Sequence, residues 1–442
     1  MPQTSQLRAA FAVRLSDMYG AEVPAYTTLL DVAGEINQEV LRRDADARRL
    51  GDISRVTAER HGAIRVGSPR EMRQAAQIFA ALGMHPVGFY DLRDAAGSSV
   101  PVVSTAFRPI AADELARNPF RVFTSMLTTA DRRFFDADLR SRLEAFVDRR
   151  ELFSPELLEL AARAERNGEL DDPAAERFLH LAVGAFELSP KPVDQAWYAE
   201  LERVSAVAAD IGGVRSTHVN HLTPRVLDID ELYRRMSERG ITMIDQIQGP
   251  PRWAGPDVLL RQTSFRALAE PRKFRAADGS VTEGTLRVRF GEVEARGIAL
   301  TREGRALYDR MVAETDRLVA ESGKSRQDVA EGVWRAHLPA DERGLADQGL
   351  AYFTYQAVLG DGTITATPIV YEDFLPRSAA GIFQSNLTDE GTRDSTQTAT
   401  AYDEGRLSEM IGRQVLDPFE LYEAQQQQSL HHARKDLGLP PI

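Results

Sequence analysis

The sequence predicts an α+β fold in which one β-α-β unit occurs twice, with helices inserted around the two copies. The motif His-x-x-x-Arg-Val occurs at residues 61–66 and again at 221–226. In both copies a polar cap and an amphipathic helix that ends at a glycine follow the motif. A Phe-Arg pair then follows the histidine by 46 residues in one copy (61 to Phe107) and by 44 in the other (221 to Phe265). Two matches at a preserved interval indicate a duplicated unit.

The duplication places two histidines at equivalent positions. Equivalent positions in a duplicated unit are brought together when the copies pack around a pseudo-twofold axis. We therefore expect His61 and His221 to face one pocket.

Length and composition bound the class of protein. A chain of 442 residues with 43% hydrophobic and 27% charged residues is typical of a soluble globular protein with two or three domains or one composite domain. The net charge of −12, with no face dense in Lys and Arg, argues against a nucleic-acid partner. The absence of cysteine excludes disulfides, thiolate catalysis and thiolate metal sites.

The sequence shows no signal for export or for a membrane. The first residues lack the apolar stretch of a signal peptide, and no apolar run approaches the length that spans a bilayer. We expect a cytoplasmic protein without a membrane partner. No residue pattern specifies an oligomeric state.

The first half of the chain divides into helices, a repeat and further helices. Residues 1–58 have apolar positions at helical spacing, at 7–19 and 26–43. The first β-α-β-β-β repeat is expected at 59–127. Its strands after the first helix are predicted at 85–92, 100–110 and 119–125. Residues 128–210 are charged and rich in Leu and Ala, which predicts a helical insertion that packs outside the sheets.

The second half follows the same order. The second β-α-β-β-β repeat is expected at 211–301 and closes with one strand over 285–296. Residues 302–390 are predicted to form helices to about 346 and then strands and a segment that close the pocket. Residues 391–442 are expected to form a polar helical tail.

The eight histidines are the first candidates for a metal site. They are His61, His85, His180, His218, His221, His337, His431 and His432. Most are expected to be structural or surface residues. Residues three apart on a strand point to opposite faces, so at most one of His218 and His221 should enter the pocket. The repeat selects His221, because it matches His61.

A carboxylate is the expected third ligand. Two neutral imidazoles and one carboxylate leave open coordination positions on a divalent iron. Glu292 and Glu294 are predicted to lie on the same face of one strand. On the residues alone, both could instead be solvated glutamates paired with neighbouring arginines.

Several motifs resemble a known family. The segment from Asn220 to the helix that ends at Gly240 looks like the opening of a vicinal-oxygen-chelate module, in which paired β-α-β-β-β units form an open sheet around a metal. Phe290-Gly-Glu292-Val-Glu-Ala-Arg296 is similar to the metal-glutamate strand of the 4-hydroxyphenylpyruvate dioxygenase type, which selects Glu292 over Glu294.

A closer resemblance covers the chain from about residue 50 to about residue 390. Four segments together resemble the 2-oxoadipate dioxygenase/decarboxylase family, also called hydroxyglutarate synthase. They are Arg60-His-Gly-Ala-Ile-Arg65, Asn220-His-Leu-Thr-Pro-Arg-Val226, Arg289-Phe-Gly-Glu-Val-Glu-Ala-Arg-Gly297 and Tyr371-Glu-Asp-Phe-Leu-Pro-Arg-Ser-Ala-Ala-Gly-Ile-Phe-Gln-Ser-Asn-Leu387.

The resemblance implies a mononuclear Fe(II) held by His61, His221 and Glu292. It implies that Arg65 binds the far carboxylate of the substrate. It further implies that Ser378 and the backbone at residue 377 lie near the substrate, in a segment that closes the pocket. Arg377 stands where a small apolar residue is expected, so an inward-pointing Arg377 would alter which dicarboxylate is preferred.

The implied reaction converts 2-oxoadipate and O2 to 2-hydroxyglutarate and CO2, with a place in lysine catabolism. The 2-oxo acid chelates the iron through two oxygens and leaves one position for O2. Arg65 lies an even number of residues after His61, so both side chains should share one strand face. Arg225 is the counterpart of Arg65 in the second repeat.

Two alternative functions stay open. One is a metal-dependent isomerase, lyase or hydrolase on the same scaffold, and the other is a dicarboxylate-binding protein without catalysis.

Overall fold

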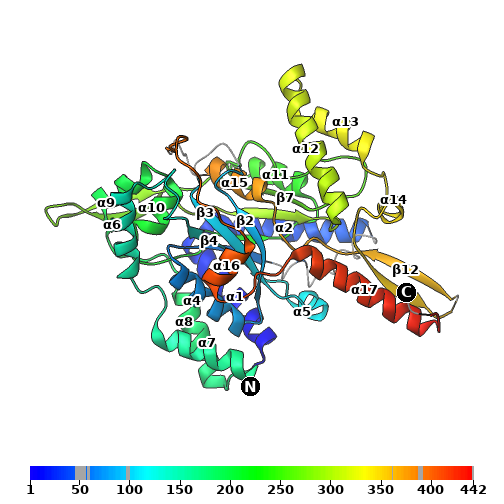
Figure 1. Cartoon of the computed structure of the whole chain (residues 1–442), viewed down its shortest axis with the longest axis horizontal. Coiled ribbons are helices and arrows are strands. Elements are labelled where there is room, and N and C mark those ends of the chain that lie inside the picture. The colour runs from blue at the N-terminus through cyan, green and yellow to red at the C-terminus, as the bar shows by residue number, and fades with distance from the viewer. Residues whose placement is uncertain (45–55, 57–59, 96–99, 361, 387–391, 441–442) are drawn as a thin grey trace.

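The computed structural model describes residues 1–44, 56, 60–95, 100–360, 362–386 and 392–440 (Figure 1). These residues do not include the domain boundaries expected at 58/59 and 390/391. They also do not include the start of the resemblance near residue 50 or Leu387, the last residue of the pocket-closing segment. The proposed division into domains therefore stays a prediction. None of the helices in the described part of the chain is long and apolar enough to span a membrane.

Two N-terminal helices pack on the outside of the two repeats. They are α1 (Thr4–Glu22) and α2 (Pro24–Arg43), as the apolar spacing predicts. The hydroxyl of Tyr19 is fully buried and contacts two carbonyl oxygens, those of Asn220 at 3.0 Å and Phe290 at 2.7 Å. Helix α1 is thus fixed to the chain beside His221.

The first repeat has the predicted β-α-β-β-β order. Its elements are β1 (Arg60–Val66), α4 (Pro69–Ala81), β2 (His85–Asp91), β3 (Val102–Arg108), a short α5 (Ala112–Arg117) and β4 (Arg121–Leu127). The strands lie in the order β2-β3-β4-β1. Strand β1 runs parallel to β4, with His61 opposite Arg121 and Arg65 opposite Ser125. Every residue of β3 and β4 is buried, so both faces of the sheet are covered.

Helices fill the stretch between the repeats. They are α6 (Ala137–Asp148), α7 (Pro155–Asn167), α8 (Asp172–Gly184), α9 (Gln195–Glu202) and α10 (Ala206–Gly212), with a short β5 (Val193–Asp194) before α9. Asp or Ser side chains cap the N-terminus of each of these five helices.

The second repeat begins with the same order. Its elements are β6 (His221–Pro224), α11 (Ile229–Glu238), β7 (Leu260–Ser264) and β10 (Glu292–Arg296). The segment before β7 supplies the remaining strand only as two isolated bridges, Met243 with Phe265 and Gln248 with Gln262. The predicted α+β fold with two β-α-β-β-β units is confirmed.

The prediction of one strand over 285–296 is wrong. The chain forms a hairpin of β8 (Glu270–Arg275) and β9 (Val281–Leu286), and only then enters β10. Strand β9 pairs with β8 while β10 pairs with β7, so the chain must change sheets between them. Gly291 makes that crossing close to the ring of Phe265, where an added Cβ would lie 2.0 Å from a ring carbon.

The two repeats join into one curved surface. Strand β1 pairs antiparallel with β6, and Ala63 lies opposite His221. A parallel bridge between Arg225 and Glu294 then connects the end of β6 to β10. The first strands of both copies and the glutamate strand therefore lie side by side at the centre of the molecule.

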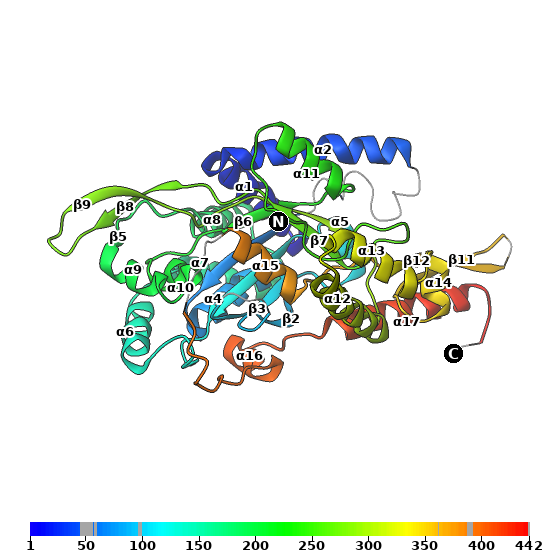
Figure 2. The same ribbon diagram turned by 90° about the horizontal axis from the view of Figure 1, so that it is seen from above.

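The C-terminal part covers this surface and extends from it. It contains α12 (Arg302–Ser322), α13 (Arg326–His337), α14 (Glu342–Asp347), β11 (Phe353–Val358), β12 (Thr363–Pro368), α15 (Pro376–Asn386), α16 (Glu404–Ile411) and α17 (Pro418–Asp436). The β8–β9 hairpin projects from one end of the long axis, and the β11–β12 hairpin with α17 lies at the other end (Figure 2).

Candidate metal centre

Three side chains from three strands converge at the seam between the repeats. The Nε2 atom of His61 lies 3.3 Å from Oε1 of Glu292, and Nε2 of His221 lies 3.5 Å from Oε2 of the same carboxylate. One donor atom from each residue lies within 4.8 Å of the others. Their exposed fractions are 1%, 4% and 2%. The structure therefore brings together the three residues that the sequence indicates as metal ligands.

The sheet pairing explains why these residues meet. Because β1 and β6 are neighbours, the imidazoles of His61 and His221 lie edge to face, with ring centroids 5.4 Å apart. Strand β10 adjoins β6 through the bridge to Glu294, which brings Glu292 to the same place. His218 precedes β6 and contacts Asp210 instead, at 3.4 Å. Of the two histidines in His-x-x-His, it is His221 that lies beside His61.

Further charges hold the ligands in position. Oε2 of Glu294 lies 2.8 Å from Nδ1 of His61, on the side of the ring away from Glu292. Arg296 donates two hydrogen bonds to Glu294, at 2.7 and 2.8 Å. Gln262 donates a hydrogen bond to Oε1 of Glu292. A carboxylate on the far nitrogen fixes the orientation of a metal-binding imidazole and raises its basicity.

The buried charges also shift the pKa values of the two histidines and the two glutamates in different directions. Burial disfavours the imidazolium of His61, but Glu294 and Glu292 outweigh it and raise the pKa of His61. Burial, with His61 and Arg65 nearby, holds the pKa of His221 well below its usual range, so this ring is neutral. Burial raises the pKa of Glu292. Burial acts likewise on Glu294, but the neighbouring cations dominate and lower its pKa to about 2.

The donor set fits a divalent cation. Within the described residues, Glu292 forms no ion pair with any Lys or Arg, although its carboxylate is buried. A buried carboxylate without a cation carries a large desolvation cost, which a bound metal ion would offset. Two imidazoles and one carboxylate on one side of an ion leave its other positions open, as in non-haem iron oxygenases.

Aromatic rings enclose the site. The ring of Phe374 packs against His61 with centroids 5.0 Å apart, and Phe290 packs against His221 at the same distance. Phe123 lies behind Phe374 at 5.1 Å. These apolar walls limit the access of water and strengthen electrostatic interactions inside.

Arg65 lies on β1, two positions beyond Ala63, and is 4% exposed. Its Nη1 atom donates to Asp210 at 2.5 Å, and its guanidinium lies 4.9 Å from the ring centre of Phe383 on α15. Its Nε and Nη2 atoms are buried and have no hydrogen-bond partner among the described residues. One edge of the guanidinium is thus free to bind another carboxylate. Asp210 comes from the end of the helical insertion, so that segment reaches Arg65.

The other two predicted residues, Ser378 and Arg377, lie in different environments. Ser378 is buried, at 4% exposure, near the start of α15. The side chain of Arg377 is 59% exposed and pairs with Asp316 at 2.6 Å. The expectation that Arg377 could point inward therefore does not describe this structure, because α15 turns that position toward α12. Arg225, the counterpart of Arg65, is buried, and its Nη2 lies 3.4 Å from the carbonyl oxygen of Arg296.

The sequence did not indicate Asp210. This carboxylate pairs with Arg65 and accepts a hydrogen bond from Asn220 at 3.0 Å. It lies 145 residues from Arg65 in the chain, inside a helix of ordinary composition. The one local signal is an acid within an otherwise apolar run, Ala206–Gly212.

Known proteins match this chain along nearly its whole length. A family model described as 2-oxoadipate dioxygenase/decarboxylase matches residues 11–386. The 2-oxoadipate dioxygenase/decarboxylase of Mycobacterium tuberculosis is 59% identical over 423 residues, covering 96% of this chain and 97% of the relative. The enzyme of that name from Pseudomonas putida is 39% identical over 463 residues, covering 98% and 97%.

Solved structures agree with the sequence matches. The crystal structure of hydroxyglutarate synthase from Pseudomonas putida in complex with 2-oxoadipate has a TM-score of 0.84 and 36% identity to this chain, covering 99% of both. A crystal structure of an uncharacterized Shigella flexneri protein has a TM-score of 0.82 and 34% identity, covering 98% of this chain and 99% of that one. On the family match and these identities, the chain belongs to the 2-oxoadipate dioxygenase/decarboxylase family.

Proposed function

We propose that the protein is an Fe(II)-dependent dioxygenase that converts 2-oxoadipate and O2 to 2-hydroxyglutarate and CO2. The observation that carries this proposal is the buried group of His61, His221 and Glu292 with Arg65 on the same strand as His61. The relatives that match nearly the whole chain bear the name of this reaction. A place in lysine catabolism and a cytoplasmic location stay predictions.

The reaction needs no reductant from outside. The six-carbon 2-oxo acid loses its first carbon as CO2, and both atoms of O2 are retained in the products, one in the new carboxylate and one in the new hydroxyl group. The oxidation of the 2-oxo acid supplies the electrons that reduce O2. A bound Fe(II) supplies Lewis acidity toward the 2-oxo acid and transfers electrons to O2.

Arg65 is the proposed anchor for the far carboxylate of the substrate. Asp210 holds Nη1, which leaves the edge formed by Nε and Nη2 for the ligand. An arginine binds a carboxylate through two parallel N–H groups, so this edge matches one carboxylate. Phe383 covers the guanidinium, and the buried Ser378 lies on the same helix. These contacts fix the distance between the anchor and the metal ligands, which favours one length of dicarboxylate.

Glu294 and the aromatic rings have supporting roles in this proposal. The carboxylate of Glu294 lies against Nδ1 of His61, which favours a proton on that nitrogen and leaves Nε2 free to bind the metal. Phe374 and Phe290 exclude water from the ligands. The low pKa of His221 keeps its ring unprotonated and ready to bind a cation.

The test is anaerobic reconstitution with Fe(II), followed by O2 uptake with a series of 2-oxo dicarboxylates of different length. We expect one O2 consumed and one CO2 released for each 2-oxoadipate, and activity that Zn²⁺ does not support. Turnover of a 2-oxo acid without O2 uptake would instead indicate a metal-dependent lyase, isomerase or hydrolase. A protein that binds the dicarboxylate but no metal would be a binding protein.

A further inference from the structure

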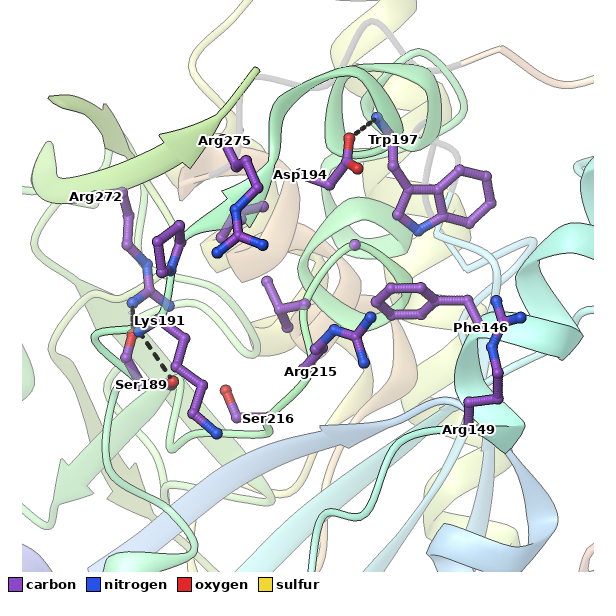
Figure 3. Close-up of a pocket in the computed structure, with 14 residues that line it drawn as sticks. Phe146, Arg149, Ser189, Lys191, Asp194, Trp197, Arg215, Ser216, Arg272 and Arg275 are labelled. Carbon is purple, nitrogen blue, oxygen red and sulfur yellow. Dashed lines mark hydrogen bonds between the residues drawn. The ribbon is translucent and has the colours of Figure 1, made fainter. Parts of the chain in front are cut away.

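A cavity that none of the three metal ligands lines carries a concentrated positive charge. It has a volume of about 300 Å³ and is enclosed by the end of α6, the segment around β5, helix α9, the loop after α10 and strand β8 (Figure 3). Its walls carry five cationic side chains and, among the described residues, a single carboxylate, Asp194. The cations are Arg149, Lys191, Arg215, Arg272 and Arg275. Such a density is unexpected in a chain whose net charge is −12.

These cations are not neutralised by the protein. No ion pair within the described residues involves Arg149, Lys191, Arg215 or Arg275, whereas most arginines elsewhere in this part of the chain pair with a carboxylate. Asp194 is occupied as the N-cap of α9, where it accepts a hydrogen bond from the backbone N–H of Trp197 at 3.0 Å. The electrostatic potential in the cavity is therefore positive.

Arg272 adds an independent sign of a missing partner. Its side chain lines the cavity and is 6% exposed, yet it forms no ion pair among the described residues. One N–H group donates to the carbonyl oxygen of Ser189, and the buried Nε has no hydrogen-bond partner in the part of the chain that the structure describes. Burial lowers the pKa of Arg272. Buried charges in proteins are normally paired, so a guanidinium in this state indicates an anionic ligand.

The cavity also has an apolar wall. The rings of Phe146 and Trp197 line it with centroids 5.9 Å apart, and the guanidinium of Arg215 lies over Phe146 at 5.5 Å. Figure 3 shows Arg215 and Arg275 reaching into the cavity from different elements, with Phe146 and Trp197 beside them. An organic anion would satisfy both parts of the wall, because its carbon skeleton can contact the rings while its charged groups meet the arginines.

We propose that this cavity is a second ligand site, which binds a compact organic anion carrying two or more negative charges. The site is separate from the metal centre, because the metal triad, Arg65 and Ser378 are not among the residues that line it. The volume accommodates a tricarboxylate or a small phosphate ester and excludes a dinucleotide. Both ligand types offer the same chemistry, that of planar or tetrahedral oxyanions bound by arginine.

Calorimetric titration of the purified full-length protein tests the proposal. The probes are tricarballylate for polycarboxylates, glycerol 3-phosphate for phosphate esters and glycerol as the uncharged control. We expect one site per chain for at least one anion, no binding of glycerol, and an affinity that falls as NaCl is raised. The anion that binds more tightly identifies the class of ligand.

Variants locate the binding. Arg272→Met should weaken it by about 10- to 100-fold, because a charged hydrogen bond in a buried site is lost. Arg215→Ser and Arg275→Ser, which alter exposed side chains, should each weaken it by about 2- to 5-fold. Arg142→Ser is the matched control: Arg142 lies over the same Trp197 ring at 5.5 Å but pairs with Glu200 and does not line the cavity.

A further variant separates this site from the metal centre. Arg65→Met protein that is shown to be folded by its urea unfolding transition should bind the probe with unchanged affinity. Loss of probe binding in folded Arg65→Met protein, with retention in Arg275→Ser, would place the anion at the metal centre and overturn the proposal. Failure of both anions to bind the unmodified protein would overturn it as well.

Discussion

Replacing Arg65 with methionine tests the proposed substrate anchor, since methionine keeps much of the apolar stem that packs near Phe383. The guanidinium is 4% exposed and has one carboxylate partner, Asp210, at 2.5 Å. A substrate carboxylate at its free edge would be a second buried partner. Removal of one member of a buried charge pair costs about 2–5 kcal/mol, which corresponds to about 30- to 5,000-fold in kcat/KM.

The same substitution leaves Asp210 buried without its arginine. A buried charge that loses its partner destabilises a protein by about 3–5 kcal/mol, so the single variant could lose activity through unfolding. Asn220 still donates to Asp210, at 3.0 Å, which offsets part of this cost. The double variant Arg65→Met/Asp210→Asn removes the residual charge. We expect it to regain stability relative to the single variant without regaining activity.

The assay combines iron content, urea unfolding and O2 uptake with 2-oxoadipate. Iron binding should be retained, because Arg65 is not a ligand. Arg225→Met is the comparison from the second repeat and should keep a larger share of kcat/KM in the folded fraction. Near-normal turnover in Arg65→Met, or loss of iron together with activity, would refute the assigned role. So would an Arg225→Met protein that folds, binds iron and shows the larger defect.

Three further predictions concern the surroundings of the site. Glu294→Gln should weaken metal binding by about 10- to 100-fold, measured by competition with a chelator, because the partner of Nδ1 of His61 loses its charge. Unchanged metal affinity would contradict the orienting role. Arg377→Ala should leave kcat/KM for 2-oxoadipate within about 2-fold, because an exposed ion pair with Asp316 contributes little. A shift in preference between 2-oxo acids of different length would show that Arg377 reaches the substrate. Burial lowers the pKa of His218 to about 4, so unfolding takes up a proton between that pH and the ordinary value of about 6.5. This contribution to stability is present above pH 6.5 and is lost as the pH falls toward 4. The unfolding free energy, measured with urea, should therefore differ less between pH 7.5 and pH 5 in His218→Gln than in the unmodified protein, by about 2 kcal/mol. An unchanged difference would show that other groups cause the acid sensitivity.

The duplicated pattern predicted the centre of the fold because it combines position with spacing. The match of residues 61–66 with 221–226 indicated two strands in equivalent places, and the structure pairs these strands directly. The first repeat was predicted in its β-α-β-β-β order, since its strands β3 and β4 are short and buried along their whole length. The short helix α5 between them was not predicted. In the second repeat the hairpin at 270–286 interrupts the unit, and its charged, exposed strands carry no periodic core signal.

Contacts between distant segments explain what the sequence could not predict. Asp210 meets Arg65 only because α10 packs against the first repeat, and no local pattern encodes that distance. Arg377 turns outward because Asp316, from another helix, lies within reach. The cationic cavity is likewise assembled from five separate segments, none of which is strongly basic by itself.

The strand register shows that the two halves differ at the candidate metal centre. Arg65 lies opposite Ser125 in the first half, and Arg225 lies opposite Glu294 in the second, both in parallel pairing. Ser125 on β4 therefore corresponds to Glu294 on β10, and two residues earlier on these two strands Phe123 corresponds to Glu292. A fully symmetric ancestor would present two histidines and two acids, a set of four donors around the ion. Phe123 in place of the second acid removes one donor from this set, so the asymmetry itself leaves the open positions that the proposed reaction needs for a chelating substrate and O2.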